Sequence, residues 1–224
     1  MIQVAVDGPA VSGKSSTAKH LARRLGFLYL DSGAVYRAIT LAVLRGLVLE
    51  DPLPPKLDAL GLELGPHPSG LGCAVRMEGE DVSERIRAED VTCAILPISG
   101  HPDVRAWVTG FLRAAAGQHD VVMDGRDIAT VVFADARFKF FVTASLEARS
   151  ERRRRDLERQ GQAADSARIA EMLRRRDEGD MSRPVGPLRR APDAVLIDNS
   201  ATTLEETVER MADLILRRHA IGRR

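Results

Sequence analysis

Residues 7–16, DGPAVSGKSS, contain the spacing G-x-x-x-x-G-K-S from Gly8 to Ser15. They follow a short apolar run at residues 2–6 and precede a segment whose apolar residues recur with helical spacing. Glycines let the backbone approach phosphate oxygens, and successive amides then point inward at the positive end of a helix. The sequence therefore predicts a phosphate-binding loop made of Gly8, Pro9, Ala10, Val11, Ser12, Gly13, Lys14, Ser15 and Ser16.

The lysine and serine of this loop indicate that it binds a nucleoside triphosphate. Lys14 can reach the β- and γ-phosphates, and the Ser15 hydroxyl can hold Mg²⁺. The alternative is a chance glycine-rich turn that caps a helix, which the agreement of motif, strand and helix disfavours. The chain has no guanine-reading Asn-Lys-x-Asp segment, so a GTPase is not indicated.

The remaining chain predicts an open α/β fold with three layers. Nearly continuous apolar runs at residues 2–6, 27–30, 120–123, 138–142 and 194–197 fit five strands of a parallel sheet buried on both faces. Segments with helical spacing separate these runs.

Two irregular regions interrupt this alternation, one rich in proline and glycine and the other in arginine. We expect one domain over residues 1–224. Its expected parts are a core (1–47, 101–155 and 184–224), an inserted subdomain (48–100) and a mobile lid (156–183).

Composition limits the class of protein. Apolar residues make up 44% of the chain, charged residues 29%, and the formal net charge is +1, so no overall field favours nucleic acid or membranes. No apolar run approaches the roughly 20 residues of a membrane span, and no secretion signal is visible. Cys73 and Cys93 have no metal-ligand spacing. They could form one disulfide, but reduced thiols are favoured. We expect a cytoplasmic monomer.

Two polar segments follow predicted strands. DSGAVYR contains Ser32, Tyr36 and Arg37, and DGRD contains Asp124, Arg126 and Asp127. Loops at the carboxyl ends of parallel strands face the ligand crevice. Arg126 could bind a phosphate with two hydrogen bonds, and Asp124 could hold Mg²⁺ or its water shell. The plainer alternatives are a helix that Ser32 caps, with two surface residues behind it, and a polar turn with a local ion pair.

Arginines crowd the region after residue 148. They are Arg149, Arg152, Arg153, Arg154, Arg155, Arg174, Arg175, Arg176 and Arg183. We expect most of them to be solvated. Those of a closing lid could stabilise the charge that develops during phosphoryl transfer. If RDEGDMSR is helical, Arg176, Asp180 and Arg183 share one face.

The ordered motifs DGPAVSGKSS, DSGAVYRA, EGEDVSERIR, HPDVRAWV, DGRDIATVVFADA and RRRDEGDMSR resemble the bacterial cytidylate kinases, a family of nucleoside monophosphate kinases. The resemblance covers nearly the whole chain. It implies transfer of the γ-phosphate of ATP to CMP or dCMP with Mg²⁺, on a phosphate-loop kinase fold.

The resemblance also implies roles for single residues. Lys14, Asp124, Arg126 and Arg176 would act at the reacting phosphates, and the substrate would contact Ser32, Tyr36, Arg37, Arg105, Arg126, Asp127, Arg176, Asp180 and Arg183. Asp127 would accept from the exocyclic amine of cytosine. The family often has a serine that reads cytosine near the position of Leu96, and Ser99 or Thr92 could replace it here.

Three other functions remain open at this point. The chain could be a phosphate-loop kinase with a different acceptor, or a nucleotide-binding regulatory module without turnover. The third, an RNA-binding protein that uses the arginine-rich segment, is disfavoured because aromatic residues are only 4% of the chain.

Overall fold

The computed structural model describes residues 1–159 and 161–221. Four residues lie outside the described chain. They are Gln160, in the expected lid range, and residues 222–224, at the end of the expected core range. Within the described residues, no helix is both long enough and apolar enough to cross a membrane.

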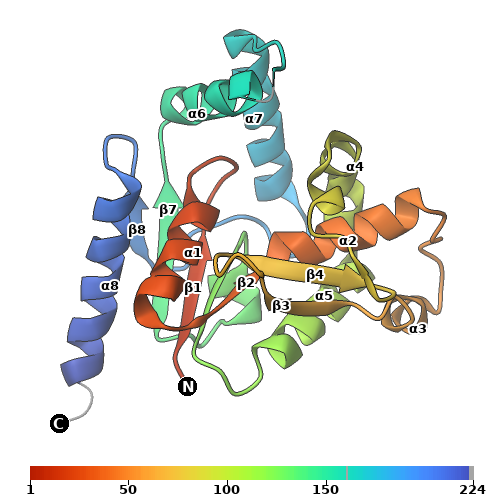
Figure 1. Ribbon diagram of the computed structural model, residues 1–224, viewed down its shortest axis with the longest axis horizontal. Helices are drawn as coiled ribbons and strands as arrows, with labels where there is room; N and C mark the ends of the chain where they lie inside the picture. The colour runs from red at the N-terminus through yellow and green to blue at the C-terminus, as the bar shows by residue number, and fades with distance from the viewer. Residues whose placement is uncertain (160, 222–224) are drawn as a thin grey trace.

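A five-stranded parallel sheet forms the centre of the molecule (Figure 1), as the apolar runs predict. Its spatial order is β2-β6-β1-β7-β8. The strands are β1 (Gln3–Asp7), β2 (Leu28–Asp31), β6 (Val121–Gly125), β7 (Phe138–Thr143) and β8 (Val195–Asp198). Val4, Val122 and Phe140, on the three inner strands, are almost completely buried, which explains why these strands lack polar alternation.

Helices cover both faces of this sheet. Helices α1 (Lys14–Leu25) and α8 (Leu204–Ile221) pack against each other on one face, while α5 (Pro102–Ala116) lies behind the sheet (Figure 1). Helix α1 ends at Gly26, which adopts the left-handed conformation with φ 71°. Helix α2 (Ser32–Leu44) ends two residues before Gly46, the end expected from the sequence.

The segment between α2 and α5 contains a second, smaller sheet. Its three antiparallel strands are β3 (Glu63–Pro66), β4 (Cys73–Met77) and β5 (Glu80–Asp81). The same segment contains α3 (Leu53–Asp58), the short turn η1 (Arg85–Arg87) and α4 (Glu89–Gly100). The hairpin predicted in CAVRMEGEDVSERIR is confirmed as β4 and β5. Helix α4 packs against α2, which brings this segment beside the carboxyl end of β2.

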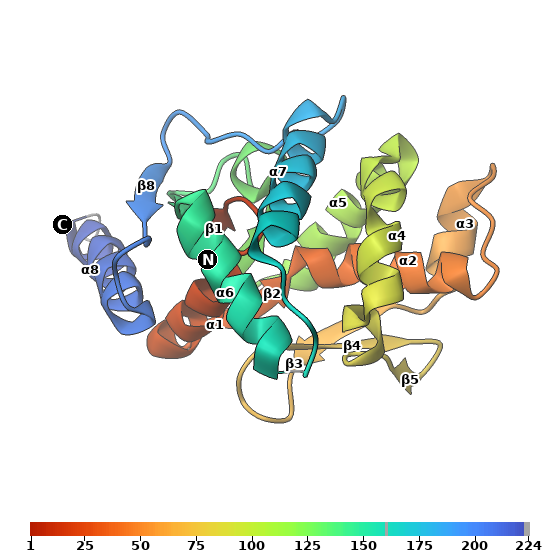
Figure 2. The same ribbon diagram turned by 90° about the horizontal axis from the view of Figure 1, so that it is seen from above.

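The arginine-rich region forms two helices, α6 (Leu146–Arg159) and α7 (Ser166–Ser182). They stand above the carboxyl ends of the strands (Figure 1), and seen from above α7 lies between α6 and α4 (Figure 2). The sequence RDEGDM is helical, as the shared-face hypothesis requires, and Arg183 follows the last helical residue.

The register of the sheet brings acidic side chains to one edge. Asp31 is paired with Asp124 across β2 and β6, and Asp7 with Gly125 across β1 and β6. All three carboxylates are buried. Buried carboxylates are costly without partners, so this edge is where the chemistry is expected.

Candidate active site

The phosphate loop joins β1 to α1, and its two motif glycines are required by shape. A Cβ on Gly8 would lie 2.0 Å from the carbonyl oxygen of Val142, so any side chain would collide with β7. Gly13 has φ 86° and immediately precedes the first residue of α1. Val11 also adopts a left-handed conformation, with φ 58°, which is unfavourable for a β-branched residue. Contacts from outside the loop must therefore hold it.

Two such contacts reach the carbonyl oxygen of Ser12. The Nδ2 of Asn199, which follows β8, donates to it at 2.9 Å, and the Nη1 of Arg152 on α6 donates at 3.2 Å. Arg152 also donates to the side chain and the carbonyl of Asn199. The loop is thus fixed on its outer side, which leaves its inner side for a ligand.

The Lys14 side chain, at the end of the loop, has no partner among the residues that the structure describes. Its side chain is almost completely buried, and no hydrogen bond or ion pair joins its Nζ to a described residue. Burial, and after it the positive charges of Arg126 and Arg176, lower the pKa of Lys14 to about 7. The buried hydroxyls of Ser12 and Thr17 also lack partners. An anion bound in the loop would provide hydrogen-bond acceptors and a negative charge for these groups.

The oxygen ligands for a divalent cation lie next to Lys14. Ser15 Oγ donates to Asp124 Oδ2 at 2.6 Å, and the Tyr29 hydroxyl donates to Asp124 Oδ1 at 2.6 Å. Burial raises the pKa of Asp124, the neighbouring Asp31 raises it further, and Lys14 opposes them. No group of three or more His, Cys, Asp or Glu in the described chain could hold a metal ion by itself. One hydroxyl and one carboxylate suit Mg²⁺, which keeps waters and takes its remaining ligands from phosphates.

Three arginines from separate elements surround the same space. Arg37 comes from α2, Arg126 from the end of β6 and Arg176 from α7. Burial lowers the pKa of Arg176 to about 10, and the next largest cause is repulsion by Arg126. Burial also lowers the pKa of Arg37, where Arg126 is again a repelling neighbour. Like charges that are buried together raise the free energy of the empty protein, and an anion among them removes that cost.

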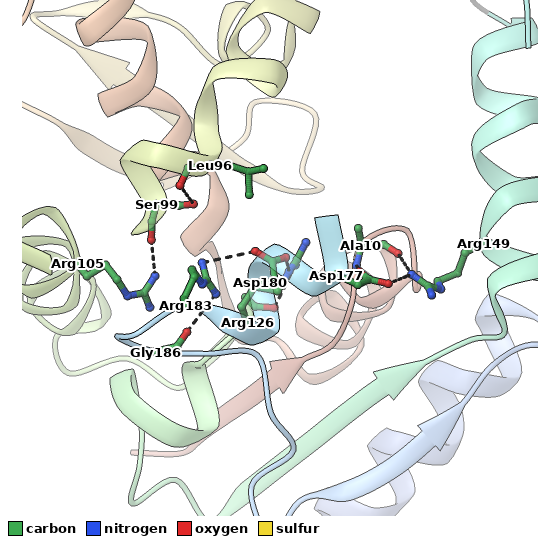
Figure 3. A network of polar contacts seen from close by, with 11 residues as sticks. Ala10, Leu96, Ser99, Arg105, Arg126, Arg149, Asp177, Asp180, Arg183 and Gly186 are labelled. Carbon is green, nitrogen blue, oxygen red and sulfur yellow. Dashed lines mark hydrogen bonds and ion pairs between the residues drawn. The ribbon is translucent and has the colours of Figure 1, made fainter. Parts of the chain in front are cut away.

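Two of these three arginines are oriented by hydrogen bonds to neighbouring side chains. Arg126 Nε donates to Asp180 Oδ2 at 2.7 Å, which joins β6 to α7 (Figure 3). Arg37 Nη1 donates to the Thr92 hydroxyl at 2.7 Å, which joins α2 to α4. Arg176 makes no hydrogen bond with a described residue. Two of the three guanidiniums are therefore oriented before any ligand arrives.

A second buried network lies farther along α7. Arg105 on α5 donates to the Asp127 carboxylate. It also donates to the Ser99 carbonyl at 2.8 Å (Figure 3). The Arg105 guanidinium lies over the Tyr36 ring, 5.5 Å from its centroid, and burial raises the pKa of Tyr36 to about 12. Gly186 covers the Arg105–Asp127 pair so closely that a Cβ there would lie 2.2 Å from Arg105 Nη2.

This network also contains Arg183. Its Nη2 donates to the Gly186 carbonyl at 3.1 Å, and the buried Nε atoms of Arg105 and Arg183 lack partners. The Thr92 hydroxyl is engaged by Arg37, and Ser99 Oγ donates to the Leu96 carbonyl at 3.2 Å. Which residue replaces the serine expected near Leu96 stays a prediction.

The alternative in which Ser32 caps the second helix is wrong. Asp31 is the N-cap, and its side chain accepts from the Ala34 amide at 3.1 Å. Ser32 is the first helical residue, and its hydroxyl donates to the Asp124 carbonyl at 2.8 Å. The serine therefore connects the DSGAVYR and DGRD segments rather than ending a helix.

Several site residues were missed by sequence reasoning. Asp7 accepts from the amides of Ile128 and Ala129 at 2.9 and 2.8 Å, and burial raises its pKa to about 7. It thereby holds the backbone that follows DGRD. Its position between an apolar run and the loop glycine was the only available signal. Arg149 and Asp177 contact the phosphate loop, as described below.

A phosphate loop on a parallel sheet, with a magnesium-type hydroxyl and carboxylate pair and arginines from separate segments, defines the class of small phosphate-loop kinases. The cytidylate kinase family profile matches residues 4–217. The chain belongs to this family and is a phosphotransferase.

Proteins named cytidylate kinase in several bacteria are similar to this chain over nearly their whole length. That of Mycobacterium avium (strain 104) is 42% identical over 230 residues, which cover 99% of this chain and 98% of the relative. That of Geobacillus kaustophilus (strain HTA426) is 42% identical and covers 96% of each chain. That of Nocardia farcinica (strain IFM 10152) is 42% identical and covers 98% of this chain and 95% of the relative.

Proposed function

We propose that the protein transfers the γ-phosphate of ATP to CMP or dCMP, giving CDP or dCDP for pyrimidine nucleotide metabolism. The observation on which this rests most is the group of unpaired or mutually repelling cations Lys14, Arg37, Arg126 and Arg176 around one space. Membership of the cytidylate kinase family supports the choice of acceptor.

ATP would lie with its phosphates in the loop of residues 8–16, against Lys14. Mg²⁺ would be held by the Ser15 hydroxyl directly and by Asp124 through water, which fits the 2.6 Å contact between these two side chains. When bound, the ion neutralises phosphate charge. Asp124 has no need to act as a strong base, because the acceptor phosphate is already an anionic nucleophile.

CMP would place its phosphate between Arg37 and Arg126, with Arg176 near the transferred group. Asp180 supports this role because it fixes the Arg126 guanidinium at 2.7 Å. The cytosine would lie toward Asp127, Arg105, Tyr36 and Arg183, with Ser32 nearby. Asp127 Oδ2 is engaged by Arg105, so Oδ1 would accept from the exocyclic amine. Uracil presents a carbonyl at that position, which a carboxylate disfavours.

The rate then arises from positioning and charge neutralisation. The acceptor oxygen and the γ-phosphorus must be held in line, and Lys14, Arg126 and Arg176 stabilise the charge spread over the moving group. That the active unit is a monomer stays a prediction. Closure of the segment 156–183 and a cytoplasmic location stay predictions.

A coupled assay with ATP, Mg²⁺ and a panel of monophosphates tests the proposal. CMP and dCMP should be the preferred acceptors. Equal or greater rates with AMP, GMP or shikimate would contradict it. Calorimetry with CMP alone would then show whether the acceptor site binds cytosine at all.

A further inference from the structure

The tip of the phosphate loop is held by the same helix that orients the acceptor arginine. The Ala10 amide donates to Asp177 Oδ1 on α7 at 3.2 Å, and Arg149 Nη1 on α6 donates to the Ala10 carbonyl at 3.2 Å (Figure 3). Arg149 and Asp177 also form an ion pair. Both backbone polar groups of Ala10 are therefore bound by one buried pair.

This pair is built to hold a fixed geometry. Asp177 and Arg149 are 7% and 8% exposed, and Arg149 Nε donates to the Ala144 carbonyl at 3.2 Å. Around them is a small apolar cluster separate from the main core, in which Ala10 packs with Ile169 and Leu173. The loop tip is thus fixed to α6 and α7 by both polar and apolar contacts.

The next loop residue explains why such a hold is needed. Val11 has φ 58°, a conformation that a β-branched side chain disfavours by about 1–3 kcal/mol. A free loop would relax from it, and ATP would have to restore it on binding. Contacts that impose it in advance remove that cost from the binding step.

On the same helix, one turn after Asp177, Asp180 orients Arg126. Asp177 faces the loop for the donor, and Asp180 faces the arginine assigned to the acceptor. One rigid helix thus contacts both halves of the site, through residues of the same face.

We infer that Asp177 and Arg149 are positioning residues that hold the phosphate loop in its ATP-binding shape and join it, through α7, to the acceptor arginine. The inference rests on the proposed function for the identity of the acceptor, whereas its donor half does not depend on the acceptor. Neither residue need touch substrate.

The test is D177N, which keeps the size of the side chain. An asparagine oxygen can still accept from Ala10, but its NH₂ would face the Arg149 guanidinium, donor against donor. We expect a non-hydrolysable ATP analogue to bind about tenfold more weakly by calorimetry, the loss typical of a charged hydrogen bond. Binding of CMP alone should stay within about twofold of the unaltered protein.

The matched control is E178Q, the same chemical change on the adjacent residue. Glu178 is exposed and makes no side-chain hydrogen bond or ion pair with a described residue. This variant should bind both ligands normally. A merely structural defect in D177N would weaken both ligands together, and D177E should recover part of the ATP affinity because it keeps the charge.

D177N leaves Arg149 buried without its partner and could reduce stability. The double variant D177N/R149Q replaces the pair with two neutral amides and should fold while showing the same selective loss of ATP affinity. Normal binding of the ATP analogue by either variant, or equal losses for the analogue and CMP, would overturn the inference. Failure of CMP turnover in the unaltered protein would overturn the proposed function only, because the ATP analogue is titrated without an acceptor.

Discussion

Replacement of Lys14 by methionine should stabilise the empty protein and abolish its activity. Methionine keeps an apolar stem of similar length but removes the buried, unpaired ammonium. A lysine whose pKa falls from 10.5 to about 7 has lost about 5 kcal/mol of preference for its charged form. Because the surrounding structure relaxes, we expect a gain in the free energy of unfolding on the order of 2 kcal/mol.

This gain in the free energy of unfolding should depend on pH, and the direction of the dependence follows from the lowered pKa of Lys14. Between the native value of about 7 and the unfolded value of 10.5, the unfolded state binds more protons, so the unaltered protein gains stability as pH rises. Below the native pKa, Lys14 is protonated in both the folded and the unfolded state. Burial of its charge then destabilises the folded state in full. The free energy of unfolding of the variant should therefore exceed that of the unaltered protein most at about pH 6.5 and least at about pH 9.5.

Chemical denaturation of both proteins across this range measures the difference. Asp7, whose pKa is raised to about 7, is present in both proteins, so its contribution largely cancels in the comparison. A non-hydrolysable ATP analogue should stabilise the unaltered protein far more than the variant. A variant that is less stable at about pH 6.5, or a difference that does not change with pH, would refute the reasoning.

Three further substitutions test other parts of the site. S15A should raise the half-saturating Mg²⁺ concentration about tenfold, and an unchanged Mg²⁺ titration of the coupled assay would count against the assigned ligand. D127N should lower the kcat/KM ratio for CMP over UMP about tenfold, in line with the discrimination of one base-edge contact; an unaltered ratio would remove Asp127 from base reading. G13A puts a Cβ 2.9 Å from Asn199 Nδ2 at a φ of 86°, so calorimetry should show ATP affinity lost and CMP affinity kept; normal ATP binding would mean that the loop tolerates the side chain.

The core of the fold could be predicted because its strands are buried on both faces. Residues 120–123 and 138–142 read as continuous apolar runs, and each is confirmed as a strand within one or two residues. The order of the strands could not be predicted, because β6 lies between β2 and β1 through contacts distant in sequence. Local patterns contain no information on such pairings.

The arginine-rich helices show where sequence reasoning fails. Arg149 is buried, whereas Arg155 on the same helix is exposed. A helix with so many arginines offers little apolar contrast from which to infer its buried face. The contact of Asp177 with the phosphate loop spans 167 residues, so nothing local to either segment could indicate it.

The assignment of the α2 cap to Ser32 was wrong for a different reason. Asp31 and Ser32 are adjacent, and both residue types are good N-caps. The choice between them depends on the Asp124 carbonyl, which accepts a hydrogen bond from the Ser32 hydroxyl at 2.8 Å. Tertiary structure therefore decides between two local signals of similar strength.

A crystal structure with a bisubstrate analogue, in which five phosphates join adenosine to cytidine, addresses the proposed arrangement of both substrates at once. We expect the phosphates on the adenosine side among the loop amides and Lys14, and the phosphate nearest cytidine within hydrogen-bond distance of Arg37 and Arg126, with the base facing Asp127. An analogue bound with Arg37 and Arg126 turned into solvent, or with the cytidine outside the space between α4 and α7, would contradict the account.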